Sequence, residues 1–166
     1  MFRKLIATSE DYAALVTRVV LGLVMLPHGL QKVFGWFGGY GFNATLGFFS
    51  TKLGIPAPLG VLVILAESLG ALALVVGLLG RFSAFGVAAT MIGAVAMVHG
   101  HNGFFMNWNG TQPGEGYEYH LLALAMAAAI MIRGSGALSL DRLLQRGLAR
   151  PESRGFEVTP RPAVTA

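Results

Sequence analysis

The sequence contains no cysteine and few charged residues. The absence of cysteine excludes disulfide bonds, thiol catalysis, and zinc or iron–sulfur centres held by cysteine within this chain. Charged residues make up only 12% of the 166 positions, whereas hydrophobic residues make up 54% and the mean hydropathy is +0.63. This balance lies outside that of soluble globular domains and is typical of a polytopic membrane protein. Any redox chemistry would therefore require a cofactor or partner from outside the chain.

The sequence also lacks the pattern of a nucleic-acid-binding protein. Twelve Lys and Arg residues exceed eight Asp and Glu residues, which gives a formal net charge of +4. These basic residues are not clustered beside aromatic residues, as nucleic-acid recognition requires. We therefore expect the lipid bilayer, and no nucleic acid, among the partners.

Long apolar runs dominate the sequence. Residues 59–79 carry one charge, Glu67, and residues 82–98 carry none, so each run is long enough to cross a hydrocarbon core of about 30 Å. The last apolar run, residues 121–132, is too short, so its helix must begin near residue 117. The pattern predicts an all-α membrane protein with a four-transmembrane-helix bundle, whose spans cover residues 12–34, 59–79, 82–98 and 117–132.

Two shorter helices are expected at the membrane surface. Residues 35–58 are rich in glycine and aromatic residues and too interrupted to span, but residues 43–53 fit a short interfacial helix. Ser139 is a candidate N-cap for an amphipathic helix over residues 139–150, with leucines on one face and arginines on the others. Residues 151–166 are expected to form a disordered tail, which leaves residues 1–150 as one membrane domain.

The basic residues predict the orientation of this bundle. Ten of the twelve fall on the side of the N-terminus, and only Lys32 and Lys52 fall on the other side. Because cytoplasmic segments carry an excess of Lys and Arg, both termini are predicted to be cytoplasmic.

A polar segment, residues 99–120, interrupts the apolar runs and is predicted to lie on the outer face. It holds three of the four histidines and two of the eight acidic residues but no Lys or Arg. We expect this segment to cap the bundle and to turn its His and Glu side chains inward to a site.

Two ionisable residues are expected deep inside the bundle. Glu67 falls near the middle of its span, where a carboxylate is costly unless it is paired or protonated. Arg18 enters from the cytoplasmic side and is long enough to approach it, so we predict an Arg18–Glu67 pair with a catalytic role. The alternative is a purely structural ion pair.

A second group of polar residues is expected at the outer level of the bundle. His28 and Lys32 share a face of the first helix, His99 ends the third, and Glu118 and His120 begin the fourth. With Glu67 and Arg18, His28 and Glu118 are candidate catalytic groups, whereas Lys32, His99 and His120 are candidate cofactor-binding groups.

Several ligands fit this outer group. The residues could form a proton-transferring pocket for a quinone head group, since His and Glu exchange protons near neutral pH. A metal held by His99, His101, Glu118 and His120, or a haem between His28 and His99 or His120, is less well supported because no fixed ligand motif is present. We therefore assign no metal ligand. The simplest alternative is a set of interfacial polar residues that only contact water and lipid headgroups.

Several short motifs, in order, resemble the DoxX family of small bacterial inner-membrane proteins. They are R-x-x-L-G from Arg18, H-G-L-Q-K at 28–32, A-E-S-L-G-A-L at 66–72, V-G-L-L-G-R at 76–81, G-Y-E-Y at 116–119 and G-S-G-A-L-S-L-D at 134–141. By position, Arg18, His28, Lys32, Glu67 and Glu118 match recurrent polar positions of that family.

The resemblance implies a four-helix, multi-pass protein of the bacterial inner membrane, often labelled an oxidoreductase. Some relatives serve as the quinone-linked subunit of a thiosulfate-oxidising enzyme, and others accompany redox or detoxifying proteins. The expected function is therefore a membrane subunit of a redox system that binds a quinone-like molecule and works with a redox protein partner. The alternative is a non-enzymatic membrane partner or scaffold, or a small-solute permease.

Overall fold

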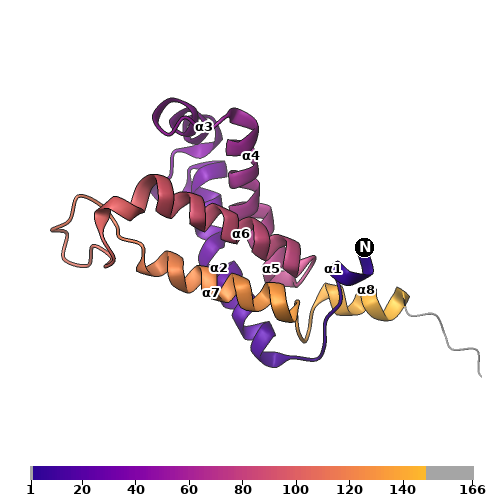
Figure 1. Cartoon of the computed structure of the whole chain (residues 1–166). Helices are drawn as coiled ribbons and strands as arrows, with labels where there is room; N and C mark the ends of the chain where they lie inside the picture. Colours follow the sequence, from indigo (N-terminus) through magenta and orange to yellow (C-terminus); the bar gives the residue numbers. More distant parts are fainter. Residues whose placement is uncertain (1, 149–166) are drawn as a thin grey trace, which may run out of the picture.

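The computed structural model describes residues 2–148, and every regular element in that range is a helix (Figure 1). The elements are α1 (Phe2–Leu5), α2 (Tyr12–Phe34), η1 (Trp36–Gly38), α3 (Gly41–Lys52), α4 (Ala57–Leu65), η2 (Ala66–Gly70), α5 (Ala71–Val76), α6 (Gly80–Ala94), η3 (Val95–His99), η4 (Gly100–Asn102), α7 (Glu118–Arg133) and α8 (Leu140–Leu148). The tail predicted for residues 151–166 lies outside the described residues.

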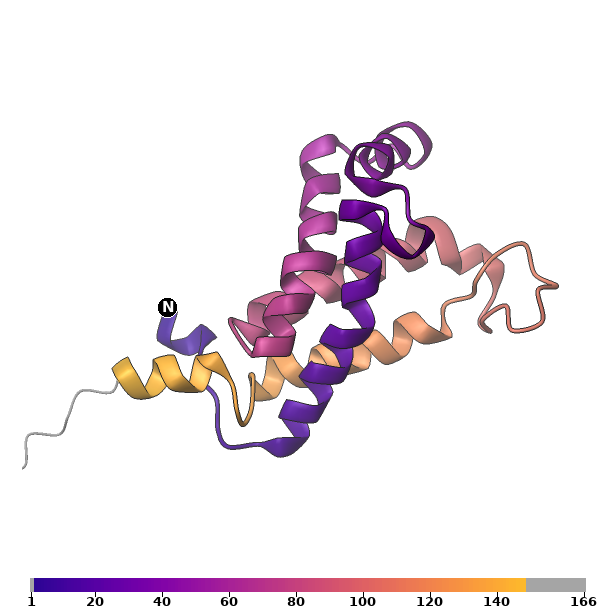
Figure 2. The same ribbon diagram turned by 180° about the vertical axis from the view of Figure 1, so that it is seen from behind.

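The long helices form two antiparallel pairs that cross. Helix α2 packs along the continuous path of α4, η2 and α5, while α6 packs along α7. Figures 1 and 2 show the far ends of α4 and α6 diverging, so the two pairs are splayed at one end. The buried core between the pairs is formed by residues such as Leu21, Met25, Leu74, Val87 and Ile130.

Three helical stretches are long and apolar enough to cross a membrane: Tyr12–Phe34, Ala57–Val76 and Gly80–Asn102. Their positions confirm the apolar runs as helices, and the first has the predicted bounds. Helix α7 has 16 residues and packs in the same bundle, so the fourth span and the side on which the termini lie stay predictions. The interfacial helix predicted at residues 43–53 corresponds to α3.

The second span ends earlier than predicted, at Val76, because Gly77 adopts a left-handed conformation with φ 71°. Asp141 then holds the turn to α6: its carboxylate accepts hydrogen bonds from the backbone N–H groups of Leu79 (2.7 Å) and Gly80 (3.0 Å). Asp141 is 1% exposed. Helix α8 is thereby fixed to the α5–α6 turn.

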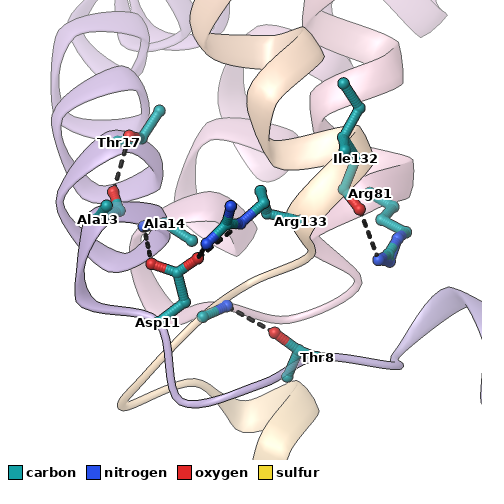
Figure 3. A network of polar contacts seen from close by, with 9 residues as sticks. Thr8, Asp11, Ala13, Ala14, Thr17, Arg81, Ile132 and Arg133 are labelled. Carbon is teal, nitrogen blue, oxygen red and sulfur yellow. Dashed lines mark hydrogen bonds and ion pairs between the residues drawn. The ribbon is translucent and has the colours of Figure 1, made fainter.

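We call the end that contains α1, α8 and the α5–α6 turn the terminal end, and the end that contains η1, α3 and residues 103–117 the loop end. A polar network joins the chain segments at the terminal end (Figure 3). The N-cap residue Asp11 accepts hydrogen bonds from the backbone of Ala14 (3.1 Å) and from Nε of Arg133 (2.7 Å). Arg81 donates to the carbonyl oxygens of Ala7 (3.1 Å) and Ile132 (3.0 Å).

Candidate functional site

A cleft of about 1090 Å³ is lined by residues of α4 and η2 on one side and of α6 and η3 on the other. Most of its lining is apolar. Its polar lining residues are His28 and Lys32 from α2, Glu67 from η2, Ser83 and Thr90 from α6, His99 from η3, Glu115 from the loop of residues 103–117, and Tyr119 and His120 from α7. Mostly apolar walls with a few converging polar groups are the usual features of a small-molecule site.

Two π-helical turns line this cleft. Element η2 carries Glu67, and η3 ends at His99. A π turn closes its hydrogen bonds over one more residue than an α turn does, so it changes the direction in which the following side chains point, and such turns are frequent at functional sites. Neither turn could be predicted from the sequence, because the residues of both fit an ordinary α-helix.

Glu67 forms an ion pair with Lys32. Lys32 Nζ donates to Glu67 Oε2, and the two side chains are 24% and 6% exposed, respectively. Gly29 permits the contact, because a Cβ at that position would overlap the backbone of Glu67 and Ser68. Each charge is thus compensated in a place where an isolated charge would be costly. Lys32 keeps two further N–H donors for a ligand.

The predicted Arg18–Glu67 pair is wrong. Glu67 lies beside Gly29, eleven residues after Arg18, which corresponds to roughly 16 Å along α2. The Arg18 side chain extends away from Glu67, to the terminal end, and is not among the residues that line the cleft.

Arg18 is instead bound by backbone carbonyls. It is 1% exposed, and its guanidinium donates to the carbonyl oxygens of five residues: Leu74 (2.9 Å), Val75 (2.6 Å), Ser135 (2.6 Å), Ala137 (3.2 Å) and Leu138 (2.8 Å). A guanidinium has five N–H donors, so all are used. Two of the acceptors lie in the last turn of α5, where the helix dipole favours a cation.

The structure brings three histidines of the predicted group to the cleft. The rings of His99 and His120 are 4.3 Å apart, and the ring of His28 lies 6.2 Å from that of Tyr119. His120 is 6% exposed, and its Nδ1 atom has no hydrogen-bond partner among residues 2–148. His120 lines the cleft, and a buried polar atom without a partner in such a residue is a candidate contact for a ligand.

Glu118 is placed differently from the prediction. It is absent from the cleft lining, and its Oε1 accepts hydrogen bonds from the backbone of Met106 (3.0 Å) and from Nε1 of Trp108 (3.2 Å). Glu118 therefore anchors the loop of residues 103–117 to the start of α7. His101 is exposed and does not line the cleft either. Among the described residues, no three His, Asp or Glu side chains are grouped as metal ligands.

Sequence reasoning missed two residues. Tyr119 lines the cleft between His28 and His120, and its hydroxyl lies 3.3 Å from the sulfur of Met25. Its position in the sequence, between the predicted site residues Glu118 and His120, could have identified it. Asp141 was interpreted as part of a surface helix, and nothing local in the sequence indicates that its carboxylate is buried.

The sequence model of the DoxX family matches residues 13–100, which contain the Lys32–Glu67 pair and both π turns. The chain belongs to the DoxX family. A Bacillus subtilis (strain 168) protein named "Putative oxidoreductase CatD" is 27% identical over 139 residues, which cover 84% of this DoxX protein and 92% of that relative. No solved structure matches the chain.

Proposed function

We propose that this DoxX protein is a membrane subunit of a redox system and that it binds a quinone-like molecule in the cleft. One observation carries the proposal. The partly buried Lys32–Glu67 pair and His120, whose Nδ1 has no partner among the described residues, both belong to a largely apolar cleft that lies between candidate membrane-spanning helices.

The polar groups of the cleft suit the chemistry of a quinone head group. A quinone accepts two electrons and two protons, and its carbonyl oxygens accept hydrogen bonds before reduction. Lys32 has free N–H donors for such an oxygen, and a neutral His120 can donate or accept at Nδ1. Both side chains line the same cleft, so each can contact a different part of one ligand.

Glu67 and the histidines are the proposed proton carriers. Glu67 holds Lys32 in place through its ion pair. When the quinone is reduced, the Lys32 ammonium gives one of the two protons to the ligand oxygen, and Glu67 passes a replacement proton from solvent to Lys32. His99 lies at the loop end beside His120, so it connects the buried imidazole to the polar segment. We assign proton transfer at the cleft to these side chains.

The electrons are proposed to come from a separate redox protein. The chain has no cysteine, and its relative carries an oxidoreductase name. The proposal places the protein in the bacterial inner membrane with four spans and cytoplasmic termini, so that the loop end of the cleft faces outward. A partner subunit could then deliver electrons at that face.

Ligand binding by purified protein in lipid nanodiscs tests the proposal. We expect a ubiquinone or menaquinone analogue to bind the wild-type protein, and Lys32→Met to weaken binding by about tenfold or more, because a charge-assisted hydrogen bond contributes about 1.5–3 kcal/mol. His120→Gln should also weaken binding. The matched controls are Lys52→Met and His101→Gln, which change residues outside the cleft.

The result that contradicts the proposal is equally clear. If no quinone binds the wild-type protein, or if the Lys32 and Lys52 variants bind equally well, the cleft is not a quinone site. Stable complexes with a partner protein that persist in Lys32→Met and Glu67→Gln would then favour the scaffold alternative.

A further inference from the structure

The cleft extends well beyond its polar groups. Its lining continues along one face of α4, η2 and α5, through Leu62, Ala66, Leu69, Gly70 and Ala73. The facing wall follows α6 from Phe82 to Gly93. A cavity of about 150 Å³ already holds a benzene ring, so a volume of about 1090 Å³ is several times what a single quinone ring needs.

Small residues line both walls. Ala66, Gly70 and Ala73 on one wall face Gly86, Ala89 and Gly93 on the other. The walls are in close contact where a Cβ on Gly86 would lie 3.3 Å from the Cβ of Ala66. At Gly93 the cleft is open, because a Cβ there would have no atom within 4 Å.

The cleft is also open sideways, toward the position of the lipid. Leu62 and Leu69 on one rim and Phe82 and Phe85 on the other are each more than half exposed, although they border the cleft. In a membrane these side chains contact acyl chains. A ligand can therefore enter between α4 and α6 from within the bilayer.

We infer that the cleft recognises a quinone with a long apolar tail, and that the tail lies between the α4–η2–α5 and α6 walls against Gly93. This inference rests on the proposed function, because the polar groups of the cleft bind the quinone head group and the apolar walls can contact only an apolar tail. Gly93 is the specificity-determining residue: it keeps the tail region open. It is six residues, or about 9 Å along the helix, from His99, the nearest ionisable cleft residue on the same helical path.

The experiment compares two ligands with the same quinone head, one with a decyl or isoprenoid tail and one with a methyl group in its place. Binding is measured in phosphatidylcholine nanodiscs, with ligand expressed as mole fraction in the lipid so that partitioning is removed. Gly93→Phe fills the open space, and Gly47→Phe on α3 is the matched control, because Gly47 also has no atom within 4 Å of an added Cβ and lies outside the cleft.

We expect Gly93→Phe to weaken binding of the tailed quinone by about tenfold, since overfilling a packed site costs about 1–3 kcal/mol. Binding of the tail-less quinone should change by no more than about twofold, as for a substitution that touches nothing. Gly47→Phe should leave both affinities unchanged. A photoreactive group at the end of the tail should label peptides that contain residues 62–73 or 82–93.

Each other outcome overturns the inference. If Gly93→Phe affects neither ligand, the tail does not occupy this region; if it weakens both ligands equally, Gly93 borders the head group instead. Photolabelling that a phospholipid with the same photoreactive group reproduces equally would assign the walls to ordinary lipid. If quinones bind but the tail makes no difference, the proposed function stands without this inference, whereas no binding of either ligand to the wild-type protein refutes both.

Discussion

At the scale of single residues, the protein stabilises buried charges in two different ways. Lys32 and Glu67 neutralise each other beside the cleft, whereas Arg18 is surrounded by carbonyl oxygens at the terminal end. The first arrangement leaves donors for a ligand, and the second uses every donor within the protein. The difference indicates that Lys32 and Glu67 are suited to chemistry and that Arg18 is suited to holding α5 and the segment before α8 together.

Replacing Arg18 tests that assignment. We expect Arg18→Lys to destabilise the protein by about 3 kcal/mol or more, because an ammonium cannot satisfy five carbonyls and leaves buried acceptors without partners. The melting temperature in detergent should fall by roughly 6–12 °C or more. Arg146→Lys on the exposed face of α8 is the control. Normal melting combined with lost quinone binding would show instead that Arg18 belongs to the binding machinery.

The sequence predicted the members of the site better than their partners. The polar residue types and their expected depth along the helices were enough to predict that His28, Lys32, His99 and His120 lie close together. The structure places these four residues at one cleft. The partner of Glu67 depends on the rotation and close approach of two helices at Gly29, and the sequence pattern does not determine either. The length of the Arg18 side chain therefore suggested Arg18 as the partner of Glu67, whereas the partner in the structure is Lys32.

At the scale of elements, the N-terminus of α2 is stabilised by a charged cap. The backbone N–H of Ala14 and the guanidinium of Arg133 both bind the Asp11 carboxylate, and they hold its pKa below the ordinary value of about 3.9. Because the pKa is lower in the folded protein, the stabilisation is complete above the unfolded-state pKa and is lost as the pH falls through the folded-state pKa.

Thermal melts of the wild-type protein and Asp11→Asn between about pH 2 and pH 7 test this effect. We expect the wild type to be more stable near neutral pH, and the difference to shrink below about pH 4, because protonated Asp11 no longer attracts Arg133. Curves that stay parallel down to the acid limit would show that the cap acts only as a neutral hydrogen-bond acceptor. Glu10, whose pKa the Arg142 side chain also lowers, accounts for pH dependence that remains in the variant.

Helix positions were predictable because apolar runs of this length have few alternatives in a membrane. The bounds of α2 agree with the prediction, and those of α3 differ by one or two residues. The π turns η2 and η3 could not be predicted in the same way, since their apolar residues satisfy the α-helical pattern equally well. The η2 turn lies where Gly29 and Gly86 pack closely against it, so tertiary packing rather than local sequence preference distinguishes this turn.

At the scale of the whole molecule, the predicted fourth span places α8 on the opposite side of the membrane from the loop of residues 103–117. The natural absence of cysteine permits a direct test, because any introduced cysteine is the only thiol in the protein. We expect Thr111→Cys, in the loop of residues 103–117, to react in whole cells with a membrane-impermeant maleimide. Gly147→Cys on α8 should react only after the membrane is permeabilised. Labelling of both from outside would show that α7 does not cross.

The π turn η2 fixes the phase between the two halves of the second long helix. If all five residues of Ala66–Gly70 were wound as an ordinary α-helix instead, one half would rotate against the other by roughly 90°. Gly60 and Ile64 would then leave the buried face that they share with Ala71 and Leu74, although every apolar residue and the overall hydropathy would be nearly unchanged. The π hydrogen bonding of these five residues is therefore a stricter constraint on this protein than their composition, and a relative with one residue fewer there can keep both buried faces through an ordinary α turn.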